Sequence, residues 1–244
     1  MSRVQSDEVC IALPTVNEYE NIRILIPQLR EMYQNAVILV IDDNSNDPTR
    51  DYLERLKLTD KNIHTIYRNY RGGVGSAHIA AMKYALESKT EFLITMDADL
   101  THDPLDVFKL LSAIQDHSHD VIIGSRYLGK KDIEGWSKFR FILTHLGHLM
   151  TKLFFKSDLD MSSGLRAYRV DKIPIGAIDI NCPQDYEFFF ISALVFLRAK
   201  MRISQVRVQL SRRGKGKSKM SIRLMARGLR QLLIFGSRIK RIQL

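Results

Sequence analysis

The sequence contains few of the residues that cross-link small secreted or metal-dependent folds. It has two cysteines in 244 residues, Cys10 and Cys182, and neither belongs to a C-x-x-C pair or to the spacing of a zinc site. A disulfide framework is therefore not indicated, and we expect two free thiols in a reducing compartment. Because 45% of the residues are hydrophobic, the chain can bury a substantial core without such cross-links.

Long apolar runs are also missing. Asp7 and Glu8 interrupt the start of the chain before a signal-peptide-like stretch can form. The longest apolar stretches, such as "ISALVFL" at 191–197, are far shorter than the roughly 20 residues that span a bilayer. We therefore expect no transmembrane segment.

Acidic residues are absent from the last part of the chain. Glu187 is the last of them, and residues 188–244 contain 15 Lys and Arg. Since the whole chain has 37 basic and 27 acidic residues, the first 187 residues hold 22 basic and 27 acidic ones, a balance of −5. A basic tail on a mildly acidic body favours a polyanionic partner: phosphates, nucleic acid or an anionic membrane surface. An ordinary solvated face is the alternative.

The first 125 residues alternate between strand and helix patterns. Expected strands lie at 9–14, 36–42, 62–67, 91–97 and 119–125, and expected helices at 17–33, after Pro48, at 76–88 and at 104–117. This alternation predicts an α/β fold with a mainly parallel sheet, right-handed crossovers and helices on both faces. In such a sheet, ligands bind beyond the carboxyl ends of the strands.

Acidic side chains follow three of the expected strands. Glu18 follows the first strand, Asp42 and Asp43 the second, and Asp97 and Asp99 the fourth. Each alone has an ordinary explanation in a turn or a helix cap. For Asp103, which directly precedes Pro104, we prefer that structural explanation. Several carboxylates at one sheet edge would repel one another unless a cation relieved the repulsion. A hard divalent ion with oxygen ligands, Mg²⁺ or Mn²⁺, that also holds substrate phosphates is the natural candidate.

Two further features have ordinary interpretations. The loop "RNYRGGVGSA" at 68–77 follows the third strand and lacks the last glycine of a dinucleotide fingerprint. We expect its glycines to permit a tight turn into the next helix. For His102, beside the acidic motif, we expect a turn or capping role rather than catalysis, and for His145 and His148 a packed or interfacial position.

Seven blocks of the sequence match one family in that family's order: "LPTVNE" (13–18), "VIDDNSND" (40–47), "GGVGSA" (72–77), "MDADLTHDP" (96–104), "GSRY" (124–127), "SSGLRAYR" (162–169) and "RGKGKSK" (213–219). The chain resembles the family 2 glycosyltransferases of the GT-A fold, and most closely the dolichol-phosphate (polyprenol-phosphate) mannose synthases. The resemblance covers nearly the whole chain. It implies a catalytic domain over 1–219 and a separate basic amphipathic helix at 220–244.

The resemblance also assigns roles to residues. The donor nucleotide sugar would contact Pro14, Val16, Glu18, Ile41, Asp43, Asp97, Ala98, Asp99, Arg126, Arg213 and Lys219, and the metal ligands would be Asp97, Asp99 and Thr101. Val16 stands where the family usually has an aromatic residue, and Thr101 where it often has Gln. The continuous apolar pattern before Asp42 and Asp43 does not show which of the two faces the ligand, so Asp43 rests on the resemblance.

The implied reaction is the inverting transfer of a sugar, most closely mannose from GDP-mannose, to a polyprenyl (dolichyl) phosphate. The acceptor oxygen is already anionic, so cations must position two phosphates and no strong general base is required. The resemblance makes Asp99, Arg126 and Arg140 catalytic and gives acceptor contacts to Arg140, Thr144, Ser163 and Arg166. The helical apolar pattern at 135–155 would then be an interface helix, although an ordinary core helix fits its periodicity equally well.

The segment 220–244 combines an apolar stripe with arginines, which suits a helix in the headgroup region of an anionic bilayer. We therefore expect a peripheral protein on the cytosolic face of a membrane, or one recruited by a membrane-anchoring partner subunit. One alternative is a nucleic-acid-binding module, for which the chain lacks an aromatic and basic platform. Another is a family 2 transferase that uses a different donor, such as UDP-glucose, or a non-lipid acceptor.

Overall fold

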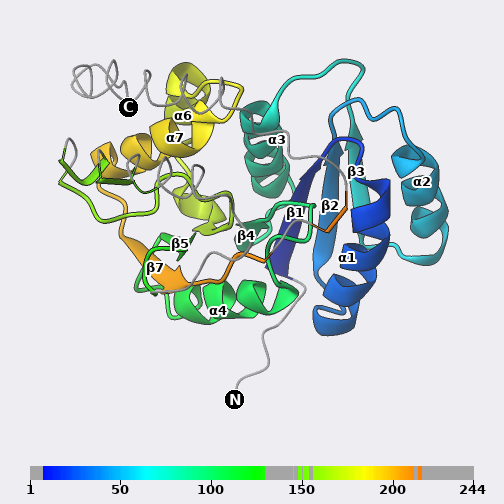
Figure 1. Cartoon of the computed structure of the whole chain (residues 1–244), viewed down its shortest axis with the longest axis horizontal. Helices are drawn as coiled ribbons and strands as arrows, with labels where there is room; N and C mark the ends of the chain where they lie inside the picture. Colours follow the sequence, from blue (N-terminus) through cyan, green and yellow to red (C-terminus); the bar gives the residue numbers. More distant parts are fainter. Residues whose placement is uncertain are drawn as a thin grey trace.

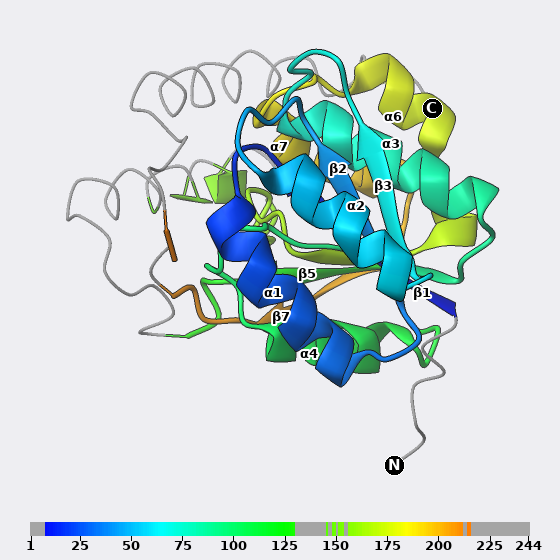
Figure 2. The ribbon, with the colours of Figure 1, turned by 90° about the vertical axis from the view of Figure 1, so that its right-hand side faces the viewer.

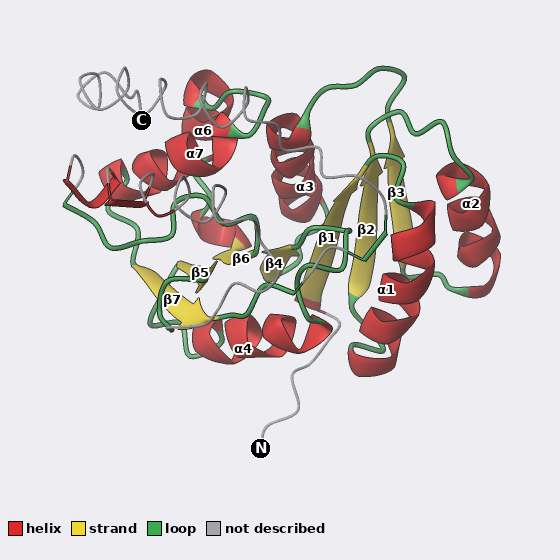
Figure 3. Cartoon of the chain, in the orientation of Figure 1, coloured by secondary structure: helices red, strands yellow, loops and turns green. Residues whose placement is uncertain are grey.

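The structure, a computed structural model, describes residues 8–129, 145, 148–149, 151–153, 156–211 and 214–215. The strands are β1 (Val9–Thr15), β2 (Val37–Asp42), β3 (Ile63–Tyr67), β4 (Phe92–Thr95), β5 (Val121–Ser125), β6 (Arg166–Arg169) and β7 (Ile203–Arg207). The helices are α1 (Tyr19–Met32), α2 (Thr49–Thr59), α3 (Val74–Glu87), α4 (Pro104–Ile114), α6 (Ile175–Asn181) and α7 (Glu187–Arg198), with a 3₁₀ turn at Val170–Lys172. Figure 3 shows the strands between the helices.

The strands form one sheet in the order β3-β2-β1-β4-β6-β5-β7. All neighbouring strands are parallel except at β6, which runs antiparallel to both β4 and β5. The prediction of a mainly parallel α/β sheet is confirmed, although the antiparallel β6 was not expected. From β1 the chain moves to β2 and β3 on one side and returns to β4 on the other. The carboxyl ends of β1 and β4 therefore meet at a topological switch point, where open α/β sheets bind their ligands.

The strands are apolar on both faces because both faces are covered by helices. In β1, Val9, Ile11 and Leu13 belong to the core beneath α1, α2 and α4, whereas Cys10 and Ala12 belong to the core beneath α3, α6 and α7. Alternate residues of one strand point to opposite faces of a sheet, which explains this division. In Figures 1 and 2, α3, α6 and α7 lie above the sheet and α4 lies below it.

The end of β4 differs from the sequence prediction in a way that matters for function. We expected a strand over 91–97, but the strand ends at Thr95. The backbone of Met96 still bonds to Ala12, and the chain then leaves the sheet. Leu100 has a positive φ of 64°, which is uncommon for a residue with a side chain. The two aspartates of the acidic motif therefore lie in a sharply turned loop rather than in the strand.

Two sequence predictions lie largely outside the described residues. These are the interface helix at 135–155, of which only isolated parts are described, and the helix at 220–244, of which none is. Within the described residues, no helix is both long and apolar enough to cross a membrane. The two cysteines are free thiols, as expected.

Candidate active site

A cleft of about 380 Å³ opens at the switch point of the sheet. Most residues that the resemblance assigned to the donor or the metal line it, namely Pro14, Val16, Glu18, Asp43, Asp97, Ala98, Asp99, Thr101 and Arg126. Ile41 differs, because its side chain is fully buried in the core under α3. The Ile41 side chain is therefore not available for the predicted contact with a nucleotide base. Arg71, which the sequence analysis did not single out, also lines the cleft.

The structure distinguishes the two aspartates at the end of β2. Asp42 is fully buried, and its carboxylate pairs with Arg50 Nε at 2.6 Å and accepts a hydrogen bond from the Ser45 backbone at 3.2 Å. Asp43 is the one that lines the cleft. The apolar pattern could not separate these residues, because the difference arises from the turn that follows the strand.

The Asp43 carboxylate organises the glycine loop before α3. It accepts hydrogen bonds from the backbones of Gly72 at 2.8 Å and Gly73 at 3.0 Å, and it pairs with Arg68 Nη1 at 3.0 Å. Gly73 has a φ of 85°, and a Cβ there would lie 2.6 Å from the carbonyl oxygen of Gln184. Only glycine fits this position without strain. The loop is thus a tight turn attached to the cleft, as its glycines indicated.

Asp97 and Asp99 occupy the loop that follows β4. Asp99 Oδ1 accepts hydrogen bonds from the backbone of Thr101 at 3.1 Å and from its hydroxyl at 2.6 Å. Asp97 Oδ2 lies 3.7 Å from Nε2 of His102, whose side chain is almost fully buried. Burial raises the pKa of Asp97, but the nearby His102 side chain outweighs burial and holds that pKa below its usual value. Asp97 is therefore a carboxylate near neutral pH.

The residues of this loop fit a divalent cation that shares its coordination with a substrate. Within the described residues, no three His, Cys, Asp or Glu side chains form a metal-binding group. Mg²⁺, however, is commonly held by one or two carboxylates together with substrate phosphates, and Asp97 and Asp99 supply two. A Cβ at Gly164 would lie 3.1 Å from Asp97 Oδ1, so this glycine leaves the space beside that carboxylate open. In this conformation the Thr101 hydroxyl supports Asp99.

The loop ends at Asp103, for which the sequence analysis preferred a structural role. Asp103 is the N-cap of α4, where its side chain accepts a hydrogen bond from Leu105 N at 2.9 Å. Pro104 follows in the first turn of the helix. The preference for a structural role at Asp103 is confirmed.

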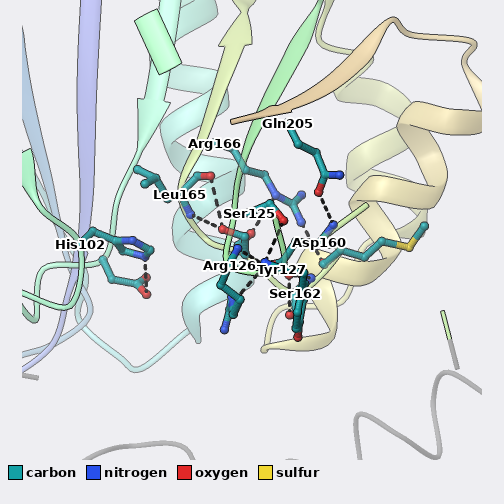
Figure 4. A network of polar contacts seen from close by, with 12 residues as sticks. His102, Ser125, Arg126, Tyr127, Asp160, Ser162, Leu165, Arg166 and Gln205 are labelled. Carbon is teal, nitrogen blue, oxygen red and sulfur yellow. Dashed lines mark hydrogen bonds and ion pairs between the residues drawn. The ribbon is translucent and has the colours of Figure 1, made fainter. Parts of the chain in front are cut away.

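Arg126 brings a positive charge to the same cleft. Its guanidinium pairs with Asp160, a residue that the sequence analysis missed. Its Nε donates to Asp160 Oδ2 at 2.9 Å, and Asp160 is fully buried. The other carboxylate oxygen accepts from the Ser162 hydroxyl at 2.8 Å, and Asp160 N donates to Gln205 Oε1 at 2.7 Å. Figure 4 shows this network. Burial lowers the pKa of Arg126, yet Asp160 raises it overall.

Two predicted acceptor contacts need correction. Ser163 and Arg166 are both fully buried. The Arg166 guanidinium donates to the carbonyl oxygens of Ser163 at 2.9 Å, Met161 at 3.0 Å and Phe189 at 2.6 Å, and to the hydroxyl of Ser192 at 2.9 Å. These bonds tie β6 to α7 and to the turn before β6, so neither side chain can contact an acceptor in this conformation. The sequence could not show this, because the insertion of β6 between β4 and β5 decides it.

Other predicted residues lie outside the described part of the chain: Arg140, Thr144, Arg213 and Lys219. The histidines near them are described. His148 stacks on Tyr127 with ring centroids 3.9 Å apart, and His145 meets the same ring edge-on at 5.5 Å. Both histidines are thus packed around the residue that follows Arg126.

The cleft brings together two carboxylates, of Asp97 and Asp99, and the guanidinium of Arg126. A mainly parallel sheet with a D-x-D loop at its switch point and an arginine in the same cleft is the arrangement of a GT-A glycosyltransferase. The family model for glycosyl transferase family 2 matches residues 10–174. The chain belongs to that family and is an enzyme that transfers a sugar.

Two relatives cover most of the chain. The undecaprenyl-phosphate mannosyltransferase of Micrococcus luteus is 32% identical over 216 residues, which are 87% of this chain and 87% of that protein. The polyprenol monophosphomannose synthase of Mycolicibacterium smegmatis is 29% identical over 216 residues, which are 86% of this chain and 80% of that protein.

Among solved structures, the glucosyl-3-phosphoglycerate synthase of Mycobacterium tuberculosis in complex with Mn²⁺, UDP and glucosyl-3-phosphoglycerate has the same fold. The TM-score is 0.69 at 17% sequence identity, and the match covers 96% of this chain and 80% of that one. This likeness supports the GT-A architecture.

Proposed function

We propose that this enzyme transfers mannose from GDP-mannose to a polyprenyl phosphate, with inversion at the sugar carbon. The observation that carries the proposal is the cleft at the switch point, which Asp97, Asp99 and Arg126 line together. A diphosphate leaving group and a phosphate acceptor both require such cationic partners. The two relatives are a mannosyltransferase of undecaprenyl phosphate and a polyprenol monophosphomannose synthase, which supports mannose and a polyprenyl phosphate.

In this proposal each group of the cleft has a defined task. Asp97 and Asp99 would hold Mg²⁺ or Mn²⁺, and such an ion would neutralise charge that develops on the leaving diphosphate. Thr101 keeps Asp99 in place through its two hydrogen bonds. Asp160 fixes the orientation of Arg126, so that its positive charge is preorganised for a phosphate. The acceptor phosphate is itself anionic, and the site therefore requires no strong general base.

We also propose that the enzyme works at a membrane surface, because its acceptor is a lipid. We assign the cytosolic face, because its anionic lipids attract basic segments such as 220–244. Arg140 and Thr144 would meet the acceptor phosphate, and Arg213 and Lys219 the donor phosphates. Large apolar side chains are exposed in the described part of the 135–155 segment: Leu149 is 50% exposed and Leu153 68%. Such exposed apolar side chains suit contact with lipid or with a membrane-anchoring partner.

A donor screen tests the proposal. The purified enzyme would be given GDP-mannose or UDP-glucose, with a short polyprenyl phosphate or a non-lipid acceptor, in Mg²⁺, in Mn²⁺ or with a chelator. We expect mannosyl transfer from GDP-mannose to the polyprenyl phosphate only, and only when a divalent ion is present. Transfer from UDP-glucose alone, or equal transfer to the non-lipid acceptor, would identify a different member of the same family.

A further inference from the structure

The loop that follows β4 and carries Asp97 and Asp99 is called the acidic loop below. Beside it lie four described residues that follow β7, and we call them the strap: Leu210, Ser211, Gly214 and Lys215. Leu210 lines the cleft. The Ser211 backbone donates to the carbonyl oxygen of Thr101 at 2.9 Å, and the Gly214 backbone donates to that of Asp99 at 2.9 Å. The strap is therefore bonded directly to the backbone of the loop that carries the metal-binding carboxylates.

The far end of the strap is held by a buried amide on α1. Asn21 is 1% exposed. Its Oδ1 accepts from Lys215 N at 2.9 Å, and its Nδ2 donates to Lys215 O at 3.1 Å. The side-chain amide thus pairs with the Lys215 peptide in both directions, as a neighbouring strand would. Nδ2 also donates to Glu18 Oε2 at 2.5 Å, which determines the orientation of the amide.

The fit at Gly214 shows that this crossing is sterically specific. A Cβ at Gly214 would lie 2.7 Å from Leu100 Cδ1 and 2.8 Å from Asn21 Oδ1. The strap passes between these two side chains, so a methyl group at Gly214 would have to displace Leu100 or Asn21. Leu100 has a φ of 64°, and residues in such conformations persist only where their surroundings hold them. The docked strap supplies part of those surroundings.

We propose that Asn21 is a positioning residue that sets the affinity of the acidic loop for its divalent ion and for the donor diphosphate. Asn21 is not among the described residues that line the cleft. It acts by pairing with Lys215, which keeps the strap on the carbonyl oxygens of Asp99 and Thr101. The ion and the donor are those of the proposed function, on which this inference rests.

Asn21→Ala is the direct test, because it removes both hydrogen bonds to Lys215, together with the one to Glu18, and keeps a good helix former in α1. We expect about a 10-fold weaker affinity for Mn²⁺ and about a 10-fold higher KM for the donor, with kcat at saturation changed less, since supporting groups of metal sites commonly contribute 10–100-fold. Mn²⁺ binding would be measured by calorimetry. Gln28→Ala, on the exposed side of the same helix, is the matched control and should behave as the unmodified enzyme.

A second variant and a second readout make the test independent of any single folding defect. Gly214→Ala should displace the strap sterically, because its Cβ would collide with Leu100 and Asn21. If both changes act by undocking the strap, the double variant should bind Mn²⁺ as tightly as whichever single variant has the lower affinity, and no less tightly. Undocking should also speed tryptic cleavage after Lys215 by about 10-fold, because proteolysis follows the population of the open form. Far-UV circular dichroism and thermal unfolding would check that each variant is folded.

The failure of this inference is distinguishable from that of the proposed function. Equal Mn²⁺ affinity and equal cleavage after Lys215 in the unmodified enzyme and in Asn21→Ala would overturn the inference, whatever the donor. An additive loss in the double variant would also overturn it. If the unmodified enzyme transfers from no sugar nucleotide while Asn21→Ala still weakens Mn²⁺ binding and speeds cleavage, the proposed function fails and the positioning role of Asn21 stands.

Discussion

Arg166→Lys replaces a planar guanidinium at a fully buried position with a single ammonium group. In the structure, three different nitrogens of Arg166 donate to Ser163, Met161, Phe189 and Ser192. Lysine has three donors, but all of them are on one nitrogen. That nitrogen cannot reach every acceptor that surrounds the three nitrogens of the guanidinium. The substitution therefore keeps the charge but leaves part of the network without a donor.

The magnitude follows from the number of bonds lost. If two of the four hydrogen bonds are not replaced, and each bond to a charged group contributes about 1.5–3 kcal/mol, the variant loses about 3–6 kcal/mol. A domain is stable by roughly 5–15 kcal/mol, so Arg166→Lys should fold at low temperature with a much lower urea midpoint. Transfer kinetics measured there should give a nearly normal KM for the acceptor phosphate.

Arg169→Lys is the matched control, because it makes the same change on the same strand. Arg169 pairs with the carboxylates of Asp120 at 3.9 Å and Asp171 at 3.3 Å, which an ammonium group can also do. Arg169 is only 16% exposed, but the carboxylate of Asp171 is 56% exposed, and an ammonium group keeps the charge of the pair. The effect of Arg169→Lys on stability should therefore be clearly smaller than that of Arg166→Lys. An Arg166→Lys variant with unchanged stability and a raised acceptor KM would refute the reasoning and would restore Arg166 as an acceptor contact.

Four further predictions concern the cleft, the core and the tail. Asp99→Asn removes the charge of a proposed metal ligand and should lower metal-dependent transfer by at least about 100-fold. Asp103→Asn makes the same change at a helix cap and should leave transfer unchanged in the same assay. Asp160→Asn removes the charge that orients the cleft arginine and should slow transfer by about 10–100-fold through misplacement, with donor KM raised. His78 is fully buried against aromatic rings, and burial lowers its pKa to about 3; the unfolded chain takes up that proton near pH 6.5. Stability should therefore fall as the pH drops from about 6.5 towards 3, by up to about 1.4 kcal/mol per pH unit, and His78→Phe should remove this part of the dependence in urea titrations. Replacing three arginines of the 220–244 segment by Gln should release the protein from anionic vesicles in sedimentation, at about 1 kcal/mol per charge, while transfer to a short soluble acceptor survives.

Each of these has a contrary outcome that can be measured. Near-normal metal-dependent transfer in Asp99→Asn would exclude that residue from the metal site. An Asp160→Asn variant with normal kinetics would show that the cleft arginine needs no partner. Identical acid sensitivity in His78→Phe and the unmodified enzyme would place the responsible group elsewhere. Full vesicle binding by the triple arginine variant would remove the membrane role of the tail.

The sequence by itself determined the α/β class and the edge of the sheet where the acids gather. The runs at 9–14 and 36–42 are apolar at every position because both faces of β1 and β2 are covered, and this local property can be read without knowledge of distant partners. Asp97 and Asp99 were assigned to the carboxyl edge because they directly follow such a run. The glycine turn and the cap at Asp103 were also local, since each depends on backbone conformation within a few residues.

The tertiary structure alone decided which polar residues reach the cleft. The strand β6 is four residues long and contains two arginines, and its partners β4 and β5 lie at least 40 residues earlier in the chain; no local pattern marks it as a central strand. Its insertion buries Arg166 and brings Asp160 to Arg126. In the same way, Asn21 meets Lys215, 194 positions later in the sequence. Contacts of this kind depend on the path of the whole chain, because the energy of a buried polar group is set by the partners that the fold brings to it.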